Sequence, residues 1–147
     1  MDLSVSVREG YSADAADIVR LLDQLGYPKT DDFIKERLLQ LISHPDAVLL
    51  VAISDDKDLV GFIAAHFIPQ LALRGDFCRI SYFCVDRQSR SMGVGWLLEE
   101  TIVEAARQRG CDRIEVHCHS RRDRAHHFYH RQGYIESPKY LVKTLTS

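Results

Sequence analysis

Long hydrophobic runs, a leader pattern and paired cysteines are all missing from this sequence of 147 residues. No apolar stretch approaches the roughly 20 residues that a membrane-spanning helix needs, and the first residues show no basic segment followed by an apolar one. The four cysteines form no C-x-x-C pair, and three lie in apolar, strand-like surroundings where cysteine packs as a small hydrophobic residue. These absences argue against a membrane protein, a secreted protein and a disulfide framework, and they predict a cytoplasmic location.

The sequence also lacks a strong excess of positive or negative charge, because its formal net charge is only −2 at pH 7. A chain this close to neutral is not expected to bind nucleic acid. The charge is unevenly spread, since acidic groups outnumber basic ones up to residue 75 and the reverse holds from residue 76 onward. The second half therefore suits a polyanionic ligand, although an uneven solvated surface would give the same pattern.

Length and composition fit one domain over residues 1–147 with a hydrophobic core, without repeats or linkers. The apolar periodicity predicts an α/β fold with the order β-α-α-β-β-β-α-β-α-β-β. Strands are expected at 4–8, 47–53, 59–68, 77–85 and 113–119, with a final hairpin formed by Tyr134 and 139–145. Helices are expected after the N-caps Ser12 and Thr30, and at 92–109 and 122–132.

The chain is organised around residues 85–98, where an apolar strand runs into two glycines and then a helix. Such a junction presents free backbone N–H groups and the positive end of a helix dipole, which together attract phosphate. The spelling Arg90-x-x-Gly93-x-Gly95 differs from both G-x-G-x-x-G and G-x-x-x-x-G-K-[ST], so a nucleotide triphosphatase is not expected. A strand–helix turn that merely needs glycine for its dihedral angles is the alternative.

This spelling resembles the acyl-CoA pyrophosphate loop of the GNAT superfamily of N-acetyltransferases, Arg/Gln-x-x-Gly-x-Gly/Ala. Residues 125–134, AHHFYHRQGY, are similar to that superfamily's later motif, which has an alanine, an aromatic–Tyr pair and a Gly–aromatic ending. The resemblance covers essentially the whole chain. It implies a mixed, mostly antiparallel central sheet flanked by helices, acetyl-CoA as co-substrate, and direct transfer of an acetyl group to a primary amine. It also implies a homodimer formed through the C-terminal strands.

The same resemblance assigns the cofactor-binding residues. The main chain of Cys84 and Val85 would hold the pantetheine arm. Arg87 would add positive charge near the phosphates, and Arg122 stands where many members carry asparagine, within reach of a phosphate, an anionic substrate group or solvent. The pyrophosphate itself would lie against the loop residues Arg90, Ser91, Met92, Gly93, Val94 and Gly95.

Catalysis needs a proton donor for the leaving thiolate and a base for the amine. Tyr129 occupies the tyrosine position of the later motif, where a phenol often donates that proton, and the pKa values of a phenol, ~10, and a thiol, ~8.5, suit the transfer. The alternative role for Tyr129 is ring packing. Many members carry a glutamate before the glycine loop as the base, but Tyr82 stands in that region. His119, Tyr82 and ordered water therefore remain candidates for the base.

The sequence leaves the acceptor open. The residues around Tyr129 look like those of small-molecule members, including aminoalkylphosphonate and aminoglycoside acetyltransferases, while a protein N-terminus or a lysine is the alternative acceptor. Arg121 and Arg122 suit an anionic acceptor, whereas the acidic N-terminal half suits a polycation. A non-catalytic acyl-CoA-binding regulatory module is the rival from another class. A metal site is not expected, because the seven histidines complete no HExxH-type pattern.

Overall fold

The computed structural model describes residues 4–90, 92–117, 123–136 and 141–146. Contacts within the chain divide it into two compact units, Met1–Val116 and His117–Ser147. The first unit contains the sheet and the helices packed on it, and the second contains the helix α4 (Asp123–Arg131). The expected single domain stays a prediction.

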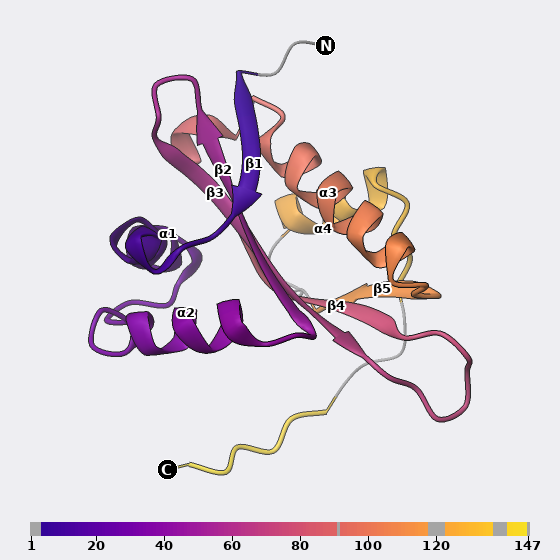
Figure 1. Ribbon diagram of the computed structural model, residues 1–147. Coiled ribbons are helices and arrows are strands. Elements are labelled where there is room, and N and C mark those ends of the chain that lie inside the picture. Colours follow the sequence, from indigo (N-terminus) through magenta and orange to yellow (C-terminus); the bar gives the residue numbers. More distant parts are fainter. Residues whose placement is uncertain (1–3, 91, 118–122, 137–140, 147) are drawn as a thin grey trace. The chain divides into compact units, whose positions relative to one another are not determined.

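In the described residues, five strands form one sheet whose spatial order follows the chain (Figure 1). The strands are β1 (Val5–Glu9), β2 (Ala47–Ser54), β3 (Leu59–Ile68), β4 (Phe77–Val85) and β5 (Arg113–Val116). Neighbouring strands are antiparallel from β1 to β4, whereas β5 runs parallel to β4. The parallel pair needs a crossover connection, and the helix α3 (Val94–Gln108) supplies it.

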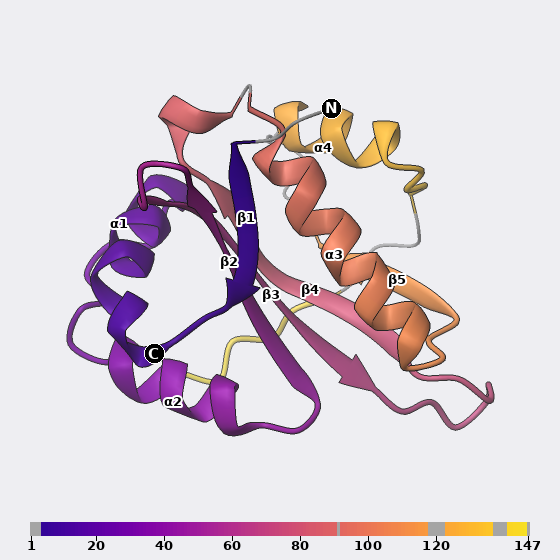
Figure 2. The ribbon, with the colours of Figure 1, turned by 45° about the horizontal axis from the view of Figure 1, so that its top comes forward.

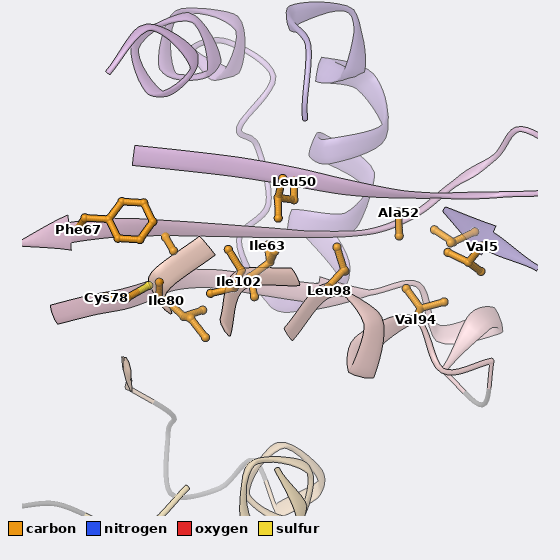
Figure 3. Packing of buried hydrophobic residues seen from close by; sticks show 13 residues of the cluster. Val5, Leu50, Ala52, Ile63, Phe67, Cys78, Ile80, Val94, Leu98 and Ile102 are labelled. Atoms are coloured by element: carbon orange, nitrogen blue, oxygen red, sulfur yellow. The ribbon is translucent and has the colours of Figure 1, made fainter. Parts of the chain in front are cut away.

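Helices cover both faces of the sheet, because alternate side chains of a strand point to opposite faces. Along β3, Ile63 and Phe67 belong to the core cluster formed with α3, whereas Phe62 belongs to the cluster formed with α1 (Ala15–Leu25) and α2 (Ile34–Ser43). Figure 2 shows α3 on one side of the sheet and α1 and α2 on the other. The α3 cluster includes the buried side chains Val94, Leu98 and Ile102, which reach toward the strands in Figure 3.

A β-bulge changes the direction of side chains in the middle of β4. Ala65 pairs with Ile80 and Ala64 with Tyr82, so Ser81 is an extra residue in the ladder. All four residues of β5 pair with Phe77–Ile80, and β4 continues beyond these pairs to Val85. The second half of β4 therefore extends past β5, and Tyr82 lies on the sheet face that α1 and α2 cover.

The predicted strands at 59–68 and 77–85 are confirmed, but both early helices begin later than their expected caps. Ser12 lies in a short 3₁₀ turn, and the carboxylate of Asp14 accepts a hydrogen bond from the Tyr11 amide. Thr30 contacts the start of α2 through its main chain, because its carbonyl accepts hydrogen bonds from the amides of Phe33 and Ile34. The helix α2 starts at Ile34, four residues after the expected cap.

The two expected C-terminal strands are not formed in residues 134–136 and 141–146, the described part of that region. Leu141 and Leu145 are 95% and 90% exposed, so this segment buries no apolar face of the kind that stabilises a strand. The fifth strand is also shorter than expected, because it ends at Val116 and His117 lies outside it. The rest of the predicted order and the mixed, mostly antiparallel sheet are confirmed.

α3 is a helix of 15 residues, of which Val94, Leu98, Glu99, Ile102 and Ala106 are buried. The described part of the chain contains no helix that combines the length and the apolar character needed to cross a membrane.

Candidate functional site

The junction between β4 and α3 leaves the first amides of α3 without a side-chain cap. Gly93 is the N-cap residue, it has a φ of +78°, and it offers no side chain to the helix. Its carbonyl accepts the first intrahelical hydrogen bond, from the amide of Leu97 at 3.1 Å. The amides of Val94, Gly95 and Trp96 have no carbonyl one turn earlier in the helix, and the first turn carries no acidic residue. The positive end of the helix dipole is thus available to an anion.

Short hydrogen-bonded turns carry the chain from β4 to Gly93. Asp86 caps the 3₁₀ turn η2 (Arg87–Ser89), because its side chain accepts a hydrogen bond from the Gln88 amide at 3.1 Å. The amide of Ser89 donates to the Asp86 carbonyl, and the amide of Met92 donates to the Ser89 carbonyl. The loop conformation is therefore built mainly from local backbone hydrogen bonds.

Four residues, which we call the α1 clamp, connect this turn to α1: Arg20, Gln24, Asp86 and Arg87. Arg20 donates from Nη1 to Asp86 and from Nη2 to the carbonyl of Leu59 at 2.9 Å. Gln24 accepts through Oε1 from the amide of Arg87 at 3.1 Å, and its carbonyl accepts from the Arg87 guanidinium at 3.5 Å. Partial burial raises the pKa of Asp86, but hydrogen bonds from the Gln88 amide and from Arg20 outweigh this and hold its pKa below the usual value. Asp86 therefore stays ionised at neutral pH.

The end of β4 supplies the two residues expected to bind the pantetheine arm. The buried thiol of Cys84 belongs to the core cluster that α1 and α2 form with the sheet, and its sulfur lies 3.3 Å from the carbonyl oxygen of Leu21. Val85 is half-buried against the α3 cluster and lies opposite Gly61 of β3. With both side chains packed in the core, a ligand at this strand end would meet the main chain.

Tyr82 lies on the α1 and α2 face and is 42% exposed. Its ring meets the ring of Tyr27 edge to face, with centroids 5.6 Å apart. Tyr27 directly follows the left-handed Gly26 that ends α1, and its amide donates to the carbonyl of Leu22. The pair therefore joins the end of α1 to the strand that leads into the glycine loop.

In the second unit, Tyr129 lies near the end of α4. Gly133, with a φ of +93°, ends the helix with a Schellman motif, in which the amide of Tyr134 donates to the carbonyl of Tyr129. The rings of Tyr129 and Tyr134 meet at 5.3 Å, and the ring of Phe128 meets that of Tyr129 at 5.4 Å. Packing of the half-buried Tyr129 ring inside its own unit is thus observed, and the proton-donor role stays a prediction.

The sequence matches the acetyltransferase (GNAT) family over residues 15–134, which include both motifs. The chain belongs to the GNAT family. A search of curated proteins gives no significant match.

Solved structures share the fold of this GNAT chain. A transcriptional regulator from Bacillus halodurans C-125 superposes with a TM-score of 0.88 at 21% identity, over 96% of this chain and 99% of that one. The aminoglycoside antibiotic 6'-N-acetyltransferase from Acinetobacter baumannii gives 0.83 at 15% identity, over 97% and 99%. Glucosamine-6-phosphate N-acetyltransferase from Arabidopsis thaliana gives 0.80 at 19% identity, over 97% and 99%. At these identities the likeness establishes the fold alone.

The structure brings most of the predicted cofactor residues of this GNAT chain together in one strand–turn–helix of the first unit. They are Cys84, Val85, Arg87, Arg90, Met92, Gly93, Val94 and Gly95. Ser91, His119 and Arg122 lie outside the described residues, and Tyr129 belongs to the second unit. Among the residues that the structure describes, no group of three or more His, Cys, Asp or Glu side chains is placed to hold a metal ion.

Sequence reasoning missed Arg20, Gln24 and Asp86. Asp86 carried a local signal, since an acidic residue that follows a strand and precedes a turn is a frequent cap. Arg20 and Gln24 carried none, because their partners in the turn lie 63 to 66 residues away in the sequence.

Proposed function

We propose that this GNAT protein is an N-acetyltransferase that moves an acetyl group from acetyl-CoA directly to a primary amine of a small molecule. One observation carries the proposal: the family match spans a glycine loop whose helix begins at a residue without a side chain and without acidic residues in its first turn. A helix start of this kind fits a pyrophosphate group.

The chain's own residues have distinct binding roles in this proposal. The amides of Val94 and Gly95 would donate to the pyrophosphate, and the exposed Arg90 would add positive charge beside it. The main chain at Cys84 and Val85 would hold the pantetheine arm. Roles for Ser91, Met92, Arg87 and Arg122 rest on the family resemblance and stay predictions.

Acetyl-CoA supplies an activated acetyl thioester when it is bound. The amine must be neutral when it reacts, and the thiolate sulfur needs a proton as it leaves. In the proposal the Tyr129 phenol donates that proton through its hydroxyl. The amine loses its proton to His119, to Tyr82 or to ordered water.

Small molecules are the proposed acceptors. Two structures that share the fold are named as acetyltransferases of an aminoglycoside and of glucosamine-6-phosphate, and both substrates are small amines. The residues around Tyr129 resemble those of small-molecule members. A protein N-terminus or a lysine side chain is the alternative, and activity on free amines but not on peptides separates the two.

A non-catalytic acyl-CoA-binding role is the rival function. The exposed Tyr82, in the region where many members carry a carboxylate, is the observation that favours it. This rival predicts tight binding of CoA, no release of CoA thiol with any amine, and no response to Tyr129→Phe.

The decisive experiment is a calorimetric titration with acetyl-CoA of the wild type, Gly95→Asp and Gly95→Ala. An aspartate near a helix N-terminus interacts favourably with the positive end of the helix dipole, so the Gly95→Asp variant should fold. Its carboxylate should at the same time repel a pyrophosphate. Alanine is allowed at this position of the family motif, so Gly95→Ala is the matched control. We expect binding by the wild type and Gly95→Ala and none by Gly95→Asp. Equal binding by all three variants, or none by the wild type, refutes the cofactor site.

A further inference from the structure

The turn that leads into the glycine loop is attached to α1 by side-chain hydrogen bonds. Arg20 bridges Asp86 and the carbonyl of Leu59, so one guanidinium contacts both the turn and the start of β3. Gln24, one helical turn further along α1, accepts from the amide of Arg87. The contacts with Asp86 and Arg87 connect residues 66 and 63 positions apart in the sequence, and the contact with Leu59 spans 39 positions.

Asp86 is the residue through which Arg20 reaches the loop. Its amide donates to the carbonyl of Val60 at 2.8 Å, its side chain accepts from the Gln88 amide, and its carbonyl accepts from the Ser89 amide. A change in the position of Asp86 therefore moves the first turn of the loop.

We propose that Arg20 is a positioning residue. Through its contact with Asp86, Arg20 holds the glycine loop in the conformation that binds acetyl-CoA. This inference deepens the proposed function and rests on it, since it assigns to α1 a part in cofactor affinity that no motif of the sequence indicates. Arg20 would act on cofactor binding through Asp86 and not by contact with acetyl-CoA.

The two hydrogen-bond acceptors of Arg20 explain why an arginine suits this position, and its guanidinium also lies 3.6 Å from the carboxylate of Asp17 on α1. Its planar fork donates from two nitrogens in fixed directions, and glutamine or lysine cannot reproduce both bonds with the charge in place. The surroundings are open and polar, with a hollow of about 320 Å³ beside the ion pair that is lined by residues including Asp17, Arg20, Lys57, Asp58, Asp86 and Gln88. Asp86, whose side chain is 15% exposed, borders this hollow, so replacing Arg20 opens its carboxylate to water and the fold should survive.

Arg109 provides a matched control for Arg20→Gln. Arg109 also pairs with a carboxylate, Asp46, and also donates to a backbone carbonyl, that of Pro45. Its side chain is 32% exposed, against 43% for Arg20. Arg109→Gln thus removes a carboxylate pair and a carbonyl hydrogen bond, together with a cation–π contact to the Phe67 ring at 4.1 Å, at a place that the cofactor loop does not involve.

The test measures two properties of the wild type, Arg20→Gln and Arg109→Gln. The first is hydrogen exchange of the backbone amides at 87–93 without ligand, and the second is the Kd for acetyl-CoA by calorimetry. In Arg20→Gln we expect faster exchange in this segment and a Kd about three- to tenfold higher, in line with the loss of a partly exposed ion pair and one further hydrogen bond. Arg109→Gln should match the wild type in both measurements.

Asp86→Asn removes the same ion pair from the other side and keeps an oxygen for the Gln88 amide, so it should raise the Kd as well. A Kd for Arg20→Gln equal to that of the wild type overturns the inference, whether or not exchange at 87–93 changes. A rise of equal size in Arg109→Gln also overturns it, because the effect would then be general. If the wild type binds no acetyl-CoA, the proposed function fails first, and the role of Arg20 in cofactor binding fails with it.

Discussion

Two aspartates of the first unit stabilise turns by accepting hydrogen bonds from both an arginine and a backbone amide. Asp14 accepts from Arg8 with both carboxylate oxygens, at 2.9 Å each, and from the Tyr11 amide at 2.7 Å. Asp86 combines Arg20 with the Gln88 amide in the same way. Each carboxylate therefore adds side-chain hydrogen bonds to a turn that local backbone hydrogen bonds already close.

Asp14 makes stability depend on pH. The hydrogen bonds from Arg8, aided by the Tyr11 amide, lower the pKa of Asp14 although burial raises it. A lowered folded pKa means that the stabilisation is complete above the unfolded value near ~3.9 and is lost as the pH falls through the folded pKa. Asp14→Asn should cost about 1–2 kcal/mol in the free energy of unfolding at pH 7, and less below about pH 4. Urea unfolding at several pH values measures this, with the exposed Asp23→Asn as control, and a gap that is constant down to pH 3 contradicts it.

Tyr129 is the residue whose chemical role can be separated from its packing. Tyr129→Phe keeps the ring contacts with Phe128 and Tyr134 and removes only the hydroxyl. With an amine acceptor found by a panel, release of CoA thiol should fall about 10²-fold, a typical contribution of a general acid, while the Kd for acetyl-CoA stays the same. Tyr134→Phe is the control and should keep the wild-type rate. Equal rates for both variants would leave Tyr129 with packing alone.

At the scale of elements, β3, β4 and α3 form the frame of the site, and Gly61 lets them approach one another. A Cβ at Gly61 would lie 3.0 Å from Val94 Cγ1, 3.1 Å from the Cys84 carbonyl oxygen and 3.2 Å from Leu98 Cδ1. All three contacts are tight, and one is with backbone that belongs to the strand ladder. The first turn of α3 can therefore lie this close to β3 only because the residue at position 61 has no side chain.

Gly61→Ala should push the first turn of α3 away from the sheet. We expect a loss of about 1–3 kcal/mol in the free energy of unfolding, as for other overpacked sites, together with weaker binding of acetyl-CoA. Gly10→Ala is the control, because its Cβ would press on the Leu49 side chain and not on α3. Chemical denaturation and calorimetry on the two variants separate the effects. Weaker binding by both variants would mean that lost stability, rather than the position of α3, lowers the affinity.

The elements that could be predicted are those whose signal is local. The strand at 77–85, the two glycines and the apolar stripe of α3 are adjacent in sequence, and the structure has them as predicted. The bulge at Ser81 and the α1 clamp depend on partners from distant segments, so no local pattern contains them. The late start of α2 has a local cause instead, because the carbonyl of the buried Thr30 accepts from the amides of Phe33 and Ile34, and the cap pattern predicted its hydroxyl as the acceptor.

At the scale of the whole molecule, the fold was predictable from two motifs in the right order, and the acceptor was not. The motifs describe how a cofactor is held, which the family shares, whereas the amine is recognised by side chains that differ between members. A cytoplasmic location and a homodimer both stay predictions, since neither follows from the described residues.

Binding of acetyl-CoA should raise the thermal stability of the whole chain, because a ligand that binds only the folded state shifts the unfolding equilibrium. At a concentration 100 times the Kd the gain is about 2.7 kcal/mol, which for a chain of this size corresponds to a rise in Tm of about 5–10 °C. Differential scanning fluorimetry with and without acetyl-CoA measures the rise. Gly95→Asp should show none, and an equal rise in that variant would place the ligand elsewhere.

The order of the strands bears on how the chain folds during synthesis. Each strand from β1 to β4 pairs with the next strand in the sequence, so these four can assemble before α3 and β5 leave the ribosome. Until α3 arrives, however, the face that carries Ile63 and Phe67 has no cover. We therefore expect a nascent chain that ends shortly after Val85 to expose apolar surface of the kind that chaperones recognise, until α3 is available to cover it.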